Sequence, residues 1–218
     1  MRLSIVNKWQ QKGQDIKGSS SNLWLGSSVA MSASGDTIII GSIYSNFGGQ
    51  PGRGRARVYR YNGSSWVTLG SSIHGENRYD YFGVAVDISP DGKTIAVGGD
   101  YNDGASGSES GTVEVYKLSG TNWSQLGSDI DGEKAGDFSG KAISLSDNGE
   151  IIAIGAARND DAATFSGHVR VFKLDSGQWV QMGSDIDGMA NDRLGESVSL
   201  SGDGSLLAIG LPFTNNID

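Results

Sequence analysis

Acidic and amide side chains recur at two fixed positions of a repeated pattern in this 218-residue sequence. The first position holds an Asp three residues before a glycine, and the second holds an Asp or Asn five residues after another glycine. The first series is Asp80, Asp137 and Asp192, with Leu23 in the remaining copy, and the second is Asn46, Asp103, Asp160 and Asn215. Carboxylate and amide oxygens can bind cations, sugar hydroxyls or cationic peptides. If both series share one face of the fold, they predict a ring of oxygen ligands there.

These residue types also have a purely structural use. Asp and Asn cap loops by bonding nearby backbone N–H groups. Any structural motif within a repeat would also recur at a fixed position. Loop capping is therefore the favoured interpretation of both series, and a ligand-binding ring is the alternative.

Aromatic residues cluster in or beside the loops that differ between copies. They are Trp24, Tyr44, Tyr79, Tyr81, Tyr101 and Phe213. Loops on a rigid scaffold carry recognition, and aromatic rings offer a large contact surface. We expect these side chains to contact a ligand.

No group of residues predicts catalysis. His74 and His168 fall at positions that vary between copies and have no evident nucleophile partner, so each is expected to be an exposed surface histidine. Cysteine is absent, which excludes thiolate chemistry, and no glycine-rich loop opens a helix to hold a phosphate. We therefore expect a protein that is not an enzyme and that needs no cofactor.

Net charge and hydropathy limit the classes of partner that the protein is expected to bind. The net charge of −8 argues against nucleic acid, because phosphate neutralisation needs a positive surface. A local basic cluster of Arg53, Arg55, Arg57 and Arg60 is expected to be an ordinary solvated outer strand, with a ridge for an acidic partner as the alternative. No apolar run approaches the ~20 residues of a membrane helix, and residues 1–8 do not form an intact signal peptide. We expect no membrane insertion, and the compartment stays open.

A repeat organises the whole chain. Trp9, Trp66, Trp123 and Trp179 are separated by steps of 57, 57 and 56 residues, and each is followed at fixed spacing by Gly, Ile and Gly. Such a period predicts one quasi-symmetric domain over residues 1–218. Because the Trp recurs at fixed phase, packing between repeats is a better interpretation of it than sugar stacking.

Each repeat is expected to form four antiparallel strands. One strand alternates, as in Val86 and Ile88, and a Gly-containing turn leads to a second strand that is apolar on both faces, such as 95–98. A third strand alternates as in Val113 and Val115, and the Trp segment forms the fourth. Four-stranded antiparallel sheets repeated radially predict an all-β fold, a β-propeller with four blades.

The two ends of the chain predict how the ring closes. The fourth copy stops after its second strand, and residues 2–16 reproduce the pattern of the third and fourth strands. Pairing of residues 2–16 with 195–210 would complete the fourth blade and close the ring, which removes exposed sheet edges. The alternatives are half of an eight-bladed homodimer and a piece of a larger propeller, so the chain is expected to be a monomer or a homodimer.

Several segments resemble the FG-GAP repeat of integrin-type propellers. They are Tyr81-Phe82-Gly83, Asp137-Phe138-Ser139-Gly140, Ile154-Gly155-Ala156-Ala157 and Ile209-Gly210-Leu211-Pro212. The segment 122–132 is similar to a subgroup with W-x-Q-L-G-x-D-I-x-G repeats, found in large secreted or surface proteins. The resemblance implies an extracellular or cell-surface location. It also implies calcium loops, but hairpins such as 89–94 offer one carboxylate each, so no metal ligand is predicted and calcium is the alternative.

The favoured function is therefore a non-catalytic binding or assembly module for a protein or glycan at a cell surface. A lectin or hydrolase-like site in the acidic ring is one alternative. A purely structural repeat within a larger assembly is the other.

Overall fold

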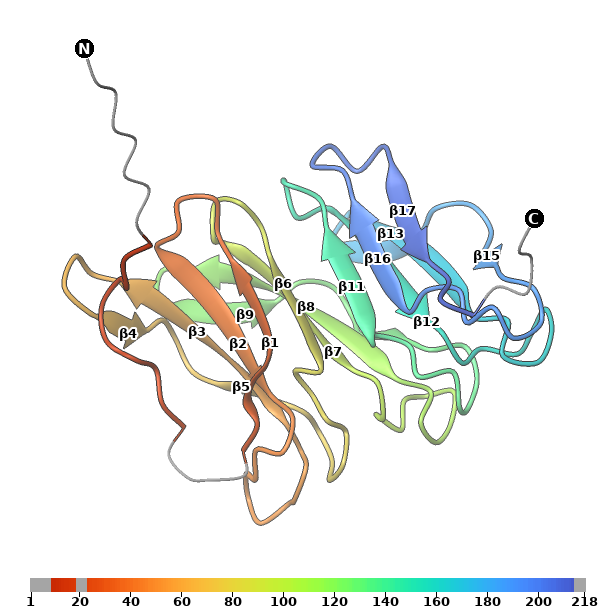
Figure 1. Cartoon of the computed structure of the whole chain (residues 1–218), viewed down its shortest axis with the longest axis horizontal. Coiled ribbons are helices and arrows are strands. Elements are labelled where there is room, and N and C mark those ends of the chain that lie inside the picture. Colours follow the sequence, from red (N-terminus) through yellow and green to blue (C-terminus); the bar gives the residue numbers. More distant parts are fainter. Residues whose placement is uncertain (1–8, 19–22, 214–218) are drawn as a thin grey trace.

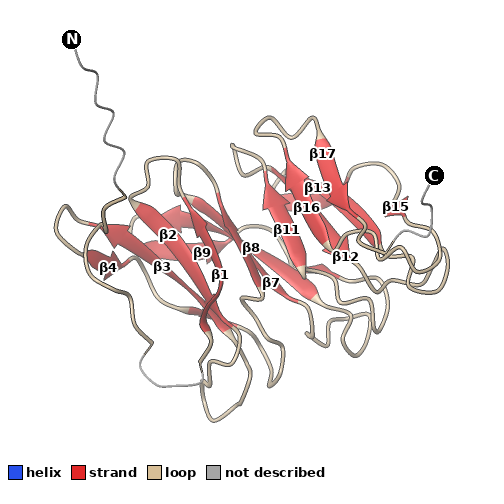
Figure 2. Cartoon of the chain, viewed as in Figure 1, coloured by secondary structure: helices blue, strands red, loops and turns tan. Residues whose placement is uncertain are grey.

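A computed structural model describes residues 9–18 and 23–213 of the chain. Over these residues the protein consists of β-strands and loops without a helix, arranged in a row of antiparallel sheets (Figures 1 and 2). It follows that no helix in this part of the chain is long and apolar enough to cross a membrane. The prediction of an all-β fold is confirmed.

The strands form four sheets in chain order. Sheet 1 contains β1 (Leu25–Met31), β2 (Thr37–Ser42), β3 (Arg55–Tyr61), β4 (Trp66–Thr68) and β5 (Ile73–His74). Sheet 2 contains β6 (Ala85–Ile88), β7 (Thr94–Gly99), β8 (Thr112–Ser119), β9 (Asn122–Gln125) and β10 (Ile130–Asp131). Sheet 3 contains β11 (Ala142–Leu145), β12 (Ile151–Ala156), β13 (His168–Asp175), β14 (Gln178–Gln181) and β15 (Ile186–Asp187). Sheet 4 contains β16 (Ser197–Leu200) and β17 (Leu207–Gly210).

Sheets 1, 2 and 3 have four strand positions each, as the sequence predicts. The outermost position is shared by two short strands, because β4 and β5 both pair with β3, and the equivalent strands do so in sheets 2 and 3. The break between β4 and β5 contains Gly70, which has a φ of +75° and leaves room for the ring of Trp123 in the next sheet. The predicted single fourth strand is thus interrupted where the neighbouring tryptophan packs.

Apolar side chains fill the spaces between neighbouring sheets. Between sheets 1 and 2 the core includes Ile39 and Val58 on one side and Ile95 and Val97 on the other. A second core of the same kind lies between sheets 2 and 3. The first strands of successive sheets also contact one another, β1 with β6, β6 with β11 and β11 with β16. Each sheet is therefore held mainly by the sheets before and after it.

The repeated tryptophan joins one sheet to the outer segment that precedes it. The indole Nε1 of Trp123 donates to the Leu69 carbonyl at 2.9 Å, and that of Trp179 donates to the Leu126 carbonyl at 2.7 Å. Trp66 makes the equivalent bond to the Lys12 carbonyl at 2.6 Å. The predicted packing role of these three tryptophans is confirmed. Trp9 is fully exposed.

The ring is not closed over the described residues. Sheet 4 has two strands there, and the first and fourth sheets lie at opposite ends of the row (Figure 1). Residues 9–18 form no strand and lie against sheet 1, where Gln14 bonds both the N–H and the carbonyl of Trp66. The sequence predicts that residues 2–16 pair with 195–210; the described residues 9–16 form no strand, and residues 2–8 lie outside the described part.

Candidate functional site

The loops that enter each first strand and the loops that leave each second strand lie together at one face. Backbone bonds join them across neighbouring sheets, from the Tyr81 N–H to the Gly52 carbonyl and from the Phe138 N–H to the Glu109 carbonyl, each 3.1 Å long. Parallel bridges pair Gly54 with Phe82 and the equivalent residues of the next junction. We call this surface the loop face.

The first acidic series is buried within these loops. Asp80, Asp137 and Asp192 each accept a bond from the backbone N–H three residues earlier, with lengths of 2.6, 2.9 and 2.9 Å. Burial raises the pKa of Asp80, although its hydrogen bonds oppose this. The observed contacts are those of loop caps, which is the interpretation that the sequence favours.

Sequence reasoning missed the buried asparagines that meet these carboxylates. Asn159 Nδ2 donates to Asp137 Oδ1 at 3.1 Å, and the Asn102 side chain bonds Asp80 in the same way. Both asparagines come one residue before the predicted Asp or Asn of their loop. Their recurrence in two copies is a signal that could have revealed the pairing.

The second series lies at the surface of the same loops. Asn46, Asp103 and Asp160 are exposed, and Asn215 lies outside the described residues. Asn46 accepts a bond from the Gly52 N–H and Asp103 from the Glu109 N–H, so both cap their own loops. The two series share the loop face as predicted, but one is buried and the other is exposed, so they do not form a single ring of side chains.

A continuous row of aromatic rings crosses the loop face. Successive rings meet edge to face, with centroid separations of 4.8 to 5.2 Å. The row, which we call the aromatic ladder, is Trp24, Tyr44, Tyr81, Tyr101 and Phe138. The guanidinium of Arg158 then lies 4.4 Å from the centre of the Phe138 ring. Four members of the ladder, Trp24, Tyr44, Tyr81 and Tyr101, are predicted from the sequence as separate ligand contacts. The structure joins them, with Phe138, in one row.

An unusual backbone conformation places every second ring of the ladder. Trp24, Tyr81 and Phe138 occupy the same repeat position and have φ values of +49°, +51° and +55°. Left-handed backbone at a bulky residue stores roughly 1–3 kcal/mol of strain and persists only where the surroundings enforce it. At Tyr81 and Phe138 the bonds between neighbouring loops enforce it. The next residue, Phe82, then points into the core while the Tyr81 ring stays on the face.

The ladder is open at one end and closed at the other. Trp24 is 61% exposed, whereas Phe138 is 7% exposed beneath Arg158. Tyr79 lies 6.3 Å from Tyr81 and, with Tyr101 and Asp103, lines a groove of about 270 Å³. Phe213, the remaining predicted aromatic contact, is exposed and is covered on one side by the guanidinium of Arg193 at 4.8 Å. The loop face therefore offers accessible rings and charged groups together.

A titratable group beside the ladder was not found from the sequence. Asp100 is 6% exposed, and burial raises its pKa to about 6, while the positive charges of Lys141 and Arg158 lower it. Lys141 also forms an ion pair with Glu196 at 2.6 Å. Asp100 occurs in one copy of the repeat, so periodicity gave no signal for it.

Two expectations about charged residues are corrected. His168 is fully buried and His74 is half-buried against the Phe47 ring, so neither is an exposed surface histidine. The four arginines 53, 55, 57 and 60 are half-buried rather than lying on an ordinary solvated outer strand. For instance, Arg57 Nε donates to the Ser72 hydroxyl at 3.0 Å. His74 and Arg57 are thus covered by loops of their own repeat, which strand parity alone does not reveal.

No protein-family model matches the chain, and no curated protein matches its sequence. Solved structures do match, among them the crystal structure of a "putative 6-phosphogluconolactonase" from Bacteroides uniformis, with a TM-score of 0.52. The fold is β-propeller-like. The match is 10% identical and covers 83% of this chain, which spans 42% of the length of the Bacteroides protein.

This neighbour overturns the expectation that the chain is not an enzyme. A protein with the same β-propeller-like fold is described as a lactonase, so the fold does not exclude catalysis. At 10% identity the likeness extends to the fold alone, and the reaction is stated of the Bacteroides protein only.

Proposed function

We propose that this β-propeller-like protein is a binding module that recognises a glycan at a cell surface through its loop face. The aromatic ladder is the observation that carries the proposal. Sugars present apolar C–H faces and polar hydroxyl edges, so they pack on aromatic rings and bond to neighbouring hydroxyl and carboxylate groups. Tyr79, Tyr101 and Asp103 supply such groups around one groove.

The rigidity of the face supports the same proposal. Its rings are fixed by backbone bonds between loops and by edge-to-face contacts with one another. A ligand that meets a preformed surface loses less free energy to ordering of the protein. Strained backbone at a surface row of aromatic residues also supports a binding role rather than a purely structural one.

Replacing Tyr101 with Ala is expected to weaken glycan binding by about tenfold or more, as for a central aromatic contact, with a small change in thermal melting. Tyr101→Phe, which keeps the ring, is the matched control and should bind nearly as well. A glycan array identifies the ligand, and calorimetry on the strongest hit measures the effect.

A blank array would contradict the glycan proposal. If Tyr101→Ala markedly lowers the melting temperature as well as the affinity for the glycan, the ladder has a structural role. Cleavage of a bound glycan would instead indicate a hydrolase-like site, for which Asp100, with its raised pKa, would be a candidate acid.

We further propose that the chain is an FG-GAP-like repeat protein in which residues 2–16 complete the fourth sheet and close a four-bladed ring. The free faces of sheets 1 and 4 each carry one side of the contacts that neighbouring sheets make elsewhere in the row. At each internal junction a Cβ on a second-strand glycine, such as Gly155, would lie about 2 Å from a backbone oxygen of the next sheet. Gly210 meets no such backbone atom, and Gly26, the equivalent partner, has open space around it.

The tryptophan contacts repeat this complementarity. Gly183 has no ring against it, whereas Gly127 lies against Trp179. Trp9 is exposed at the opposite end. Ile186 is 40% exposed although the equivalent Ile73 is 8% exposed. Completion of sheet 4 would cover Gly183 and Ile186 as the equivalent residues are covered at the internal junctions.

A comparison of Gly210→Ala with Gly155→Ala tests whether the ring is closed. In a closed ring both substitutions should destabilise the protein by about 3 kcal/mol, because each added Cβ overlaps a backbone oxygen. The measurement is urea unfolding, together with mass in solution. If Gly155→Ala alone is destabilising, the end is open and the proposal fails. A mass of two chains would replace the four-bladed ring with an eight-bladed one.

A further inference from the structure

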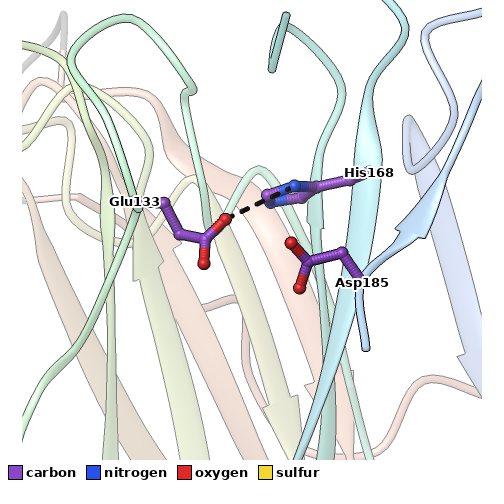
Figure 3. A group of neighbouring side chains, drawn as sticks. All are labelled: Glu133, His168 and Asp185. Carbon is purple, nitrogen blue, oxygen red and sulfur yellow. Dashed lines mark ion pairs between the residues drawn. The ribbon is translucent and has the colours of Figure 1, made fainter. Parts of the chain in front are cut away.

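Three side chains with metal-binding groups converge between sheets 2 and 3. Glu133 follows β10, His168 begins β13 and Asp185 precedes β15. One ligand atom from each lies within 4.8 Å of the other two. Figure 3 shows the three side chains pointing toward one another, with Glu133 approaching from sheet 2 and the other two from sheet 3. The cluster is therefore assembled only when the two sheets pack.

The imidazole of His168 has no hydrogen-bond partner although it is fully buried. Neither Nδ1 nor Nε2 is bonded, and Nδ1 lies 3.9 Å from Glu133 Oε2, which is too long for a hydrogen bond. A buried polar group without a partner costs roughly 1–3 kcal/mol, and such groups are rare in folded proteins. The unpaired ring nitrogens point to a ligand that the protein itself does not supply.

Two carboxylates place negative charge in the cluster, and of these Asp185 Oδ1 accepts a hydrogen bond from Gln181 Nε2 at 2.6 Å. Burial raises the pKa of Glu133, Arg170 lowers it, and the neighbouring carboxylate of Asp185 raises it further. Arg170 approaches Glu133 Oε1 at 3.6 Å and is otherwise directed to the Asp131 carbonyl at 2.7 Å. The Oε2 side of Glu133 therefore remains turned toward His168 and Asp185. Two carboxylates and a neutral imidazole make a site that favours a cation.

We propose that Glu133, His168 and Asp185 bind one divalent transition-metal ion of the zinc type, with a fourth position left for water or a ligand group. Zn²⁺ takes imidazole nitrogen and carboxylate oxygen at about 2.0–2.2 Å in a tetrahedral arrangement, so any two donors lie roughly 3.4 Å apart. The three ligand atoms now lie within 4.8 Å of one another, so binding requires them to move closer, and the exposed Glu133 and half-buried Asp185 side chains have room to do so. Mg²⁺ and Ca²⁺ prefer all-oxygen sites and should bind more weakly.

The junction between sheets 1 and 2 supplies a natural comparison. At the positions equivalent to Glu133, His168 and Asp185 it carries Glu76, Thr112 and Asp129. The acidic residues are thus present at both junctions, but the nitrogen donor is present at one. Thr112 is buried at its position, which shows that threonine fits this place in the fold.

The test measures Zn²⁺ binding to the metal-stripped chain by calorimetry and by metal analysis after dialysis. One Zn²⁺ per chain is expected, together with a rise in melting temperature, because the ion binds the folded state. His168→Thr should remain folded and lose affinity by about 100-fold, since loss of a direct ligand exceeds the 10–100-fold effect of an outer-shell partner. Glu133→Gln should weaken binding in the same direction.

His74→Gln is the matched control, because His74 is the other histidine of the chain. It should leave the stoichiometry and the affinity for Zn²⁺ unchanged. The proposal is overturned if the original chain binds no stoichiometric Zn²⁺, or if folded His168→Thr binds it as tightly as the original chain. Equal affinity for Mg²⁺ that survives His168→Thr would also overturn it, since such binding would not use the imidazole.

Discussion

Glu114→Gln is expected to stabilise the protein at pH 8 by roughly 3 kcal/mol and to have little effect near pH 4.5. Glu114 is 6% exposed on β8, and burial raises its pKa to about 7 from the usual 4.5. The negative charges of Asp129, Glu76 and Asp80 raise it further, whereas a hydrogen bond from the Tyr116 hydroxyl lowers it. Glutamine keeps an oxygen that can accept this bond and removes the charge.

The direction in which pH changes the free energy of unfolding follows from the number of protons that each state binds. Between pH 4.5 and 7 the folded state holds the Glu114 proton while the unfolded state has lost it. The free energy of unfolding therefore falls as pH rises through this window, and the full penalty is present above pH 7. The variant lacks this penalty at every pH.

Urea unfolding of both proteins from pH 4.5 to 8.5 measures the difference. Because His74 and Asp100 titrate identically in both chains, the difference isolates Glu114. Glu150→Gln, at an exposed hairpin turn, is the control and should change stability little at any pH. A difference that does not vary with pH would show that Glu114 does not carry a raised pKa.

Gly98→Ala is expected to destabilise the protein by about 3 kcal/mol or more, at the upper end of the range for overpacked sites. A Cβ at Gly98 would lie 2.0 Å from the carbonyl oxygen of Gly140 in the next sheet. The oxygen belongs to the backbone and cannot rotate away. Relief therefore requires sheets 2 and 3 to separate, which opens the apolar core between them.

Gly120→Ala is the control for this substitution. Gly120 has a φ of +63° at the β8–β9 turn, and a Cβ there would meet no atom within 4 Å. It should cost about 1 kcal/mol, the strain of a left-handed backbone alone. The measurement is again urea unfolding. Equal effects of the two substitutions would mean that contact between the sheets does not limit residue size at Gly98.

The repeat made much of the fold predictable. Alternation at Val86 and Ile88, the apolar run 95–98 and the glycine between them correspond to β6, β7 and their turn. Because the pattern recurs several times at one period, the features common to all copies can be told from the substitutions in any single copy. The type and order of the strands could therefore be inferred. The split of the outer strand could not, because the reason lies in Trp123 of the neighbouring repeat.

The loop face was predictable in outline. Topology alone placed the two loop series together, and the aromatic residues were recognised as surface contacts. The edge-to-face ladder was not foreseen, because it depends on a left-handed backbone at Tyr81 and Phe138, which their residue types do not favour. His168 escaped detection for a related reason: its burial comes from the sheet packed over it, and its carboxylate partners come from two different repeats.

The bonds from each tryptophan to the preceding repeat have a consequence for how such chains can change in length. The junction between sheets 1 and 2 and the junction between sheets 2 and 3 use the same few groups, an indole N–H, a backbone carbonyl and a glycine against the ring. A duplicated unit of one period would bring its own copy of each group and would meet its neighbours without any compensating substitution. Gain or loss of whole repeats is therefore the easiest change in size for this fold, whereas insertion of a few residues within a strand would displace every group of the junction.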